Sequence, residues 1–152
     1  DREFLLKVQV TSTGKTTMWI LLVGLTMLAS SSRAVELSDE MKEMAKMLHD
    51  TCVDETKVDE SLIDKVASGQ FADDGKLKCY FKCLFGQLGA LSDEGQLDTE
   101  AFQAVIPEDL QAAYTKMVSA CKGKDTGSDV CDASYNFYKC LYEVDPANFI
   151  TF

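Results

Sequence analysis

The segment Cys79-Tyr80-Phe81-Lys82-Cys83 places two cysteines four positions apart in an apolar stretch of the chain. Residues four apart share one face of a helix, and two cysteines in that arrangement cannot bridge each other. Each must instead pair with a cysteine of another segment, so this helix is predicted to be the hub of the fold. The apolar residues from Leu77 to Leu88 leave almost no polar face, which is typical of a buried helix.

Six cysteines are spread along the chain, with 26, 3, 37, 9 and 8 residues between them. An even number of cysteines in a small secreted domain indicates a disulfide framework rather than a redox or metal site. Six cysteines allow many pairings, and their spacing alone does not choose among them.

The N-terminal part has the features of a targeting segment. Met18 is the first methionine, ten apolar residues follow it, and the small residues Ser32 and Ala34 fit cleavage before Val35. Ten residues are about half of the roughly 20 that a membrane-spanning helix needs, so no stable membrane insertion is expected. We predict a non-native or untranslated leader at 1–17, a secretory signal peptide at 18–34 and one secreted domain at 35–152.

The charge of the predicted domain limits its partners. Residues 35–152 contain 11 basic and 23 acidic residues, which gives a net charge of −12. This charge argues against nucleic acid and against anionic membrane surfaces as partners.

Apolar residues recur at helical spacing between Gly, Pro and acidic turns, and no stretch shows the alternation of a strand. Ser38 is a plausible N-cap, and breaks are expected at Gly69, Pro107, Gly123 and Pro146. We therefore predict an all-α domain, a compact six-helix array. The expected helices lie at about 38–52, 58–67, 75–88, 98–106, 110–121 and 128–142.

The cysteine order C-x26-C-x3-C-x37-C-x9-C-x8-C resembles that of the insect odorant-binding protein family, which includes the pheromone-binding proteins. The segments 68–71, 73–78 and 93–98 are also similar to that family, and the resemblance covers essentially residues 37–152. It implies three interlocking disulfides around an apolar pocket. The implied pairs are Cys52–Cys83, Cys79–Cys131 and Cys121–Cys140.

Taken without the resemblance, the apolar residues favour a solid core over a cavity. The resemblance implies instead that they line a pocket, in which Tyr114 and Tyr138 are expected to orient a hydroxyl, ester or aldehyde of the ligand. The expected lining residues are Met44, Leu48, Phe81, Phe85, Val105, Tyr114, Met117, Val118, Phe137, Tyr138, Leu141, Phe149 and Phe152.

The C-terminal tail, residues 149–152, is too apolar for a solvated chain end. It either packs on the surface or forms a lid over the pocket mouth, and the sequence leaves both roles open. The resemblance implies a terminal carboxylate, here that of Phe152, whose hydrogen bonds weaken in acid. Protonation is then expected to loosen the lid and release ligand.

The sequence contains two partial motifs for catalysis and calcium binding, and each lacks residues that its chemistry requires. The segment His49-Asp50-Thr51-Cys52 is similar to the H-D-x-C of secreted phospholipases A2, but Ala45 and Lys46 stand where that family has paired cysteines. Around Gly95, a calcium loop would need carboxylates where Ala90 and Ala101 lie. We expect no enzyme activity, no metal site and no cofactor.

These observations predict a secreted carrier of small hydrophobic ligands, odorants or pheromones. It would move them through aqueous lymph to an olfactory receptor, as a monomer or homodimer, with pH-dependent release through the tail. Two alternatives stay open. One is a non-olfactory carrier or scavenger in haemolymph, saliva or reproductive fluid, and the other is a saposin-like lipid-surface binder.

Overall fold

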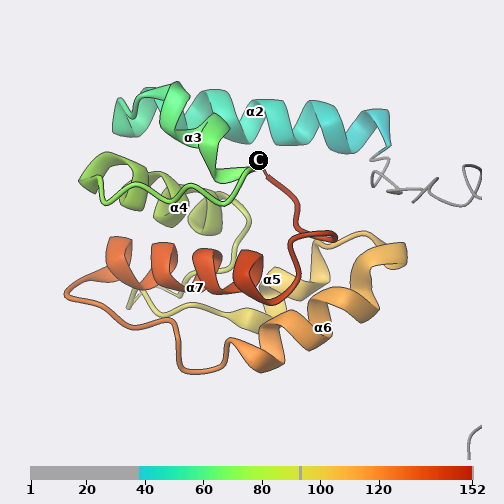
Figure 1. Cartoon of the computed structure of the whole chain (residues 1–152). Coiled ribbons are helices and arrows are strands. Elements are labelled where there is room, and N and C mark those ends of the chain that lie inside the picture. Colours follow the sequence, from blue (N-terminus) through green and yellow to red (C-terminus); the bar gives the residue numbers. More distant parts are fainter. Residues whose placement is uncertain (1–37, 93, 152) are drawn as a thin grey trace, which may run out of the picture. The chain divides into compact units, whose positions relative to one another are not determined.

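A computed structural model describes residues 38–92 and 94–151 of the chain (Figure 1). The predicted leader at 1–17, the predicted signal peptide at 18–34 and the predicted pocket residue Phe152 lie outside the described residues, so these stay predictions.

Within the described residues the chain forms six α-helices and one short 3-10 helix, and its β structure is an isolated bridge between Leu91 and Leu97. The all-α, six-helix prediction is therefore confirmed. The elements are α2 (Asp39–Thr56), α3 (Glu60–Val66), α4 (Gly75–Gln87), α5 (Thr99–Ala104), η1 (Glu108–Leu110), α6 (Gln111–Ala120) and α7 (Val130–Val144).

Short polar side chains start most of these helices. In each case a side-chain oxygen accepts a hydrogen bond from a backbone N–H of the first turn, which satisfies a donor that has no partner within the helix. The capping residues are Ser38 for α2, Asp59 for α3, Asp74 for α4, Asp98 for α5 and Asp129 for α7.

Several predicted helix ends are wrong by a few residues. Helix α2 continues beyond Cys52 to Thr56, because the residue that ends it is Lys57. Lys57 adopts a left-handed conformation, with a φ of 53°, and its N–H donates to the carbonyl of Val53. Glycine usually takes this position, so a lysine gives no warning in the sequence.

The later helices differ in a similar way. Helix α5 is shorter than the predicted 98–106, because a residue that precedes proline, here Ile106, is disfavoured in the helical conformation. Helix α7 starts after the cap Asp129 rather than at Ser128, and it continues to Val144.

Helix α4 is the hub, as predicted. It lies between α2 and α7 (Figure 1), and its side chains Tyr80, Phe81 and Phe85 are almost completely buried. The disulfides join it to both neighbours. Cys52–Cys83 connects α2 to α4, Cys79–Cys131 connects α4 to α7, and Cys121–Cys140 connects the end of α6 to α7. These are the three pairs that the resemblance implies.

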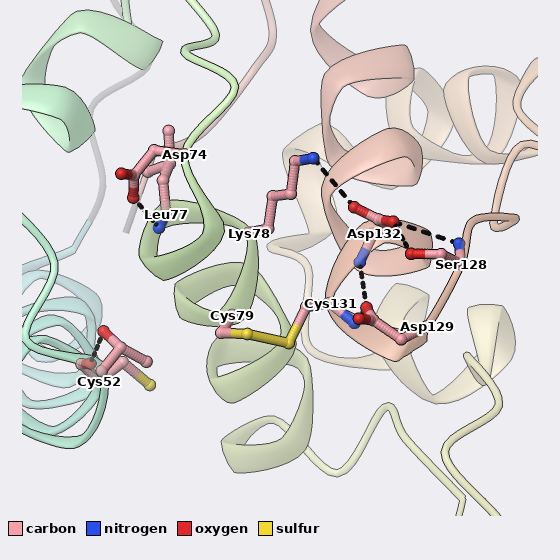
Figure 2. Close-up of a disulfide and its surroundings, with 10 residues drawn as sticks. Cys52, Asp74, Leu77, Lys78, Cys79, Ser128, Asp129, Cys131 and Asp132 are labelled. Carbon is pink, nitrogen blue, oxygen red and sulfur yellow. Dashed lines mark hydrogen bonds and ion pairs between the residues drawn. A yellow bond between two sulfur atoms is a disulfide. The ribbon is translucent and has the colours of Figure 1, made fainter.

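A polar cluster lies beside the Cys79–Cys131 disulfide, where α4 meets α7 (Figure 2). It consists of Asp73, Lys78, Ser128 and Asp132. Lys78 Nζ lies 3.0 Å from Asp132 Oδ1 and 2.5 Å from Asp73 Oδ1. The other oxygen of Asp132 accepts hydrogen bonds from the backbone N–H, at 3.2 Å, and the hydroxyl of Ser128. The hydrogen bonds from Ser128 and Lys78 lower the pKa of Asp132 from 3.8 to about 2, and both carboxylates raise the pKa of Lys78.

We expect this cluster to make the protein acid-sensitive in a defined range. Because folding lowers the pKa of Asp132, its stabilising contribution is complete above pH 3.8 and is lost as the pH falls through about 2. The melting temperature of Asp132→Asn should therefore fall less than that of the wild type across this range. Asp109→Asn, at an exposed carboxylate, is the control and should behave as the wild type. Equal pH dependence of Asp132→Asn and wild type would contradict the prediction.

Candidate ligand-binding site

The interior between α4, α6 and α7 is aromatic. Phe81 of α4 and Tyr138 of α7 stack with their ring centres 4.4 Å apart and an angle of 27° between their planes. One turn further along α4, Phe85 meets the edge of Phe102 at 5.2 Å and lies 5.9 Å from Phe137. The rings come together because Phe81 and Phe85 share one face of α4.

The predicted pocket residues gather in this one apolar cluster. In the structure they pack against one another, so their role as pocket lining stays a prediction. The buried members are Leu48, Phe81, Phe85, Tyr114, Met117, Val118, Phe137, Tyr138 and Leu141; Met44, Val105 and Phe149 are partly buried at its edge.

The C-terminal tail enters this cluster. Ile150 is only 5% exposed, and both of its backbone polar groups are bound by tyrosine hydroxyls. Its N–H donates to the hydroxyl of Tyr114 at 2.9 Å, and its carbonyl accepts from the hydroxyl of Tyr138 at 2.8 Å. Phe149 packs with its ring centre 4.8 Å from that of Tyr138. The tail is thus held by main-chain hydrogen bonds inside the protein.

This anchor changes the roles expected for Tyr114 and Tyr138. We expected both hydroxyls to orient a ligand, but in the structure they bind Ile150. The reason is that buried hydroxyl groups nearly always have a hydrogen-bond partner, and the tail supplies one. The apolar residues of the tail signalled that it packs, but no sequence signal identified the backbone of Ile150 as the bound group.

The electrostatics of the interior suit a neutral ligand. Burial raises the pKa of Tyr114 to about 12, so this hydroxyl stays neutral at physiological pH. The buried side chains of the described residues are otherwise apolar, apart from other tyrosines and Ser134. Such an interior can hold an apolar molecule and offer hydroxyl groups to a single polar atom.

His49 takes part in a structural contact between helices. Its Nδ1 lies 3.1 Å from the hydroxyl of the buried Tyr80 in α4, and its Nε2 lies 3.5 Å from Glu60 of α3. An open cleft of about 410 Å³ next to His49 is lined mainly by polar and charged side chains, among them Asp54 and Lys57. His49 thus connects α2 to α3 and α4.

Residues 38–92 and 94–151 contain neither a candidate metal cluster nor a candidate membrane-spanning helix. No cluster of three or more His, Cys, Asp or Glu side chains in residues 38–92 and 94–151 is placed to hold a metal ion. In the same part of the chain, no helix has both the length and the apolar character needed to cross a membrane.

Comparison with known proteins agrees with this architecture. General odorant-binding protein 69a of Drosophila melanogaster is 28% identical over 119 residues, which are 78% of this chain and 80% of the fly protein. Odorant binding protein 4 of Chrysopa pallens superimposes with a TM-score of 0.65 at 32% identity, covering 73% of this chain and 95% of that one. The fatty acid binding protein OBP56a from the oral disk of the blowfly Phormia regina superimposes with a TM-score of 0.57 at 26% identity, covering 73% and 96%.

The model of the PBP/GOBP family matches residues 34–144, which include all six cysteines and all six described α-helices. The chain therefore belongs to the PBP/GOBP family of insect odorant-binding proteins.

Proposed function

We propose that this protein is a carrier that takes small hydrophobic molecules into the aromatic interior between α4, α6 and α7. The observation that carries the proposal is the pair of hydrogen bonds at Ile150, whose N–H donates to the hydroxyl of Tyr114 and whose carbonyl accepts from the hydroxyl of Tyr138. They occur in an interior that is otherwise apolar, and they show that this interior accepts a segment with one donor and one acceptor. Family membership supports the same role.

Binding is proposed to involve exchange with the tail. Ile150 uses an acceptor site of the Tyr114 hydroxyl and the donor of the Tyr138 hydroxyl, so a ligand that makes these same two hydrogen bonds must displace Ile150. The space that Ile150 and Phe149 leave is lined by apolar and aromatic side chains, and burial of ligand carbon there contributes about 25 cal/mol per Å² before the entropy costs of binding.

The test is uptake of the fluorescent probe N-phenyl-1-naphthylamine by the oxidised protein. We expect uptake that a fatty acid or a volatile hydrophobic compound reverses. Ile150→Pro removes the N–H that donates to Tyr114 and should raise the affinity by about fivefold, because one hydrogen bond of about 1 kcal/mol no longer competes. Thr151→Ala, at an exposed position next to Ile150, is the control and should leave the affinity unchanged.

Two outcomes of the uptake experiment would contradict parts of this proposal. No uptake by any variant would mean that the interior is a solid core and would contradict the carrier role. Lower affinity in Ile150→Pro would mean that the tail covers the ligand as a lid, one of the two roles that the sequence leaves open, rather than competing with it.

The same titration at pH 7 and pH 5 tests the proposed pH-dependent release. The anchor at Tyr114 should persist over this range, because burial keeps the pKa of that hydroxyl near 12. The proposed response comes from the terminal carboxylate of Phe152, whose hydrogen bonds weaken in acid, as the resemblance implies. Equal affinity at both pH values would contradict acid-driven release.

Secretion, transport through lymph and delivery to an olfactory receptor complete the proposal for an olfactory carrier. The blowfly relative gives specific support to the non-olfactory alternative, since it is a fatty acid binding protein from the oral disk. The tissue in which the protein is expressed would decide between the two roles.

A further inference from the structure

A surface cavity of about 340 Å³ lies between the turn at 91–97 and the first turns of α7. Its volume falls in the range of about 300–1,000 Å³ that is usual for small-molecule sites. The lining residues include Leu91, Gln96, Leu97, Asp125, Val130 and Ser134. The proposed carrier site does not use this cavity.

Ser134 makes this cavity unusual. The residue is only 1% exposed, and its hydroxyl has no hydrogen-bond partner among the described residues. By contrast, the hydroxyls of Tyr114, Tyr135 and Tyr138 all have partners. A buried hydroxyl without a partner is destabilising, and alanine would fill the same place without that cost. The missing partner therefore points to a group that the chain itself does not supply.

The residues that line the cavity indicate what kind of molecule would supply the missing hydrogen-bond partner of Ser134. Leu91, Leu97 and Val130 form an apolar surface, while Gln96 and Asp125 add an amide and a carboxylate. The carboxylate, on a chain with a net charge of −10, disfavours an anionic ligand. A serine hydroxyl both donates and accepts, and it can turn toward the cavity by changing between staggered χ1 rotamers.

A neighbouring cavity gives room for the apolar part of such a molecule. It has a volume of about 630 Å³ and shares Leu97 and Asp125 with the first cavity. Its lining also includes Val118 and Phe137, and Phe137 lies one turn of α7 beyond Ser134. The two cavities thus share part of their walls at Leu97 and Asp125.

We propose that these two adjoining cavities form a second binding site for a small neutral alcohol, which borders the proposed carrier interior at Val118 and Phe137. The ligand hydroxyl exchanges hydrogen bonds with Ser134, and its apolar part lies against Leu97 and continues toward Phe137.

The experiment compares 2-phenylethanol with ethylbenzene, a matched pair with the same carbon skeleton that differs only by the hydroxyl group. Affinities are measured by following backbone amide shifts of the oxidised protein by NMR. The wild type should bind the alcohol at least about fivefold more tightly, with shifts at Gln96 and Ala133, and Ser134→Ala should remove this preference. Ser119→Ala, at an exposed serine of the neighbouring cavity, should keep it.

Thermal unfolding of Ser134→Ala shows whether a loss of alcohol preference comes from the missing hydroxyl or from a loss of folded protein. Ser134→Ala should have an unchanged or higher melting temperature, because it removes an unpaired buried hydroxyl. A preference for the alcohol that survives in Ser134→Ala, or alcohol shifts confined to Tyr114 and Tyr138, would overturn the second site. Uptake of N-phenyl-1-naphthylamine by Ser134→Ala should match the wild type, so failure of the carrier proposal is seen separately.

Discussion

Removing the Cys79–Cys131 disulfide by replacing both cysteines with alanine should lower the free energy of unfolding by about 4 kcal/mol. This bridge closes 52 residues, the longest loop of the three, and the entropy of the unfolded chain rises most when the longest loop is opened. A loss of this size is a large part of the roughly 5–15 kcal/mol that stabilises a typical domain. Urea unfolding followed by circular dichroism measures the change.

The shortest loop provides the comparison. Cys121–Cys140 closes 19 residues, so replacing both of its cysteines with alanine should cost about 3 kcal/mol. If replacing this pair lowers the free energy of unfolding as much as replacing Cys79–Cys131 does, or more, loop entropy does not determine the relative losses. Local contacts of the two disulfides would then dominate.

Gly127→Ala should lower the free energy of unfolding by about 3 kcal/mol. A Cβ at Gly127 would lie 2.2 Å from the Cβ of Asp132 and 3.0 Å from the backbone nitrogen of Ala133. Backbone atoms of α7 cannot move aside as the end of a flexible side chain can. The loop would have to shift, and Ser128 would lose its hydrogen bonds to Asp132.

Gly75→Ala is the matched control for this substitution. Gly75 begins α4, and nothing lies within 4 Å of a Cβ placed there. Alanine should therefore be neutral or slightly stabilising, because it restricts the unfolded chain more than glycine does. Thermal unfolding of both variants gives the comparison, and similar losses in the two would contradict the steric explanation.

Much of the fold follows from local patterns that the sequence displays directly. The pair Cys79 and Cys83 identified the central helix, because residues four apart must share a face. Apolar spacing located all six helices. Their ends were less certain, because Lys57 ends α2 in a conformation that its side chain does not favour.

The candidate site was harder to predict, because it depends on contacts between distant segments. The hydrogen bond from the N–H of Ile150 to the hydroxyl of Tyr114 joins residues 36 positions apart, and no helical or strand periodicity in the sequence predicts such a contact. The unpaired hydroxyl of Ser134 likewise becomes visible only when the surroundings of α7 are known. The resemblance implied that Tyr138 and Phe149 line one pocket, but it could not show that their rings contact each other.

The three disulfides divide the molecule into a covalently connected frame and segments held only by weaker forces. The bridges join α2 to α4, α4 to α7 and α6 to α7, whereas α3, α5 and the tail carry no cysteine. Local opening costs least where no covalent bond limits separation. If the interior binds ligands as proposed, we expect the frame to set its dimensions, and α3, α5 and the tail to set how fast a ligand enters and leaves. Substitutions in those segments should alter exchange rates more than they alter which molecules fit.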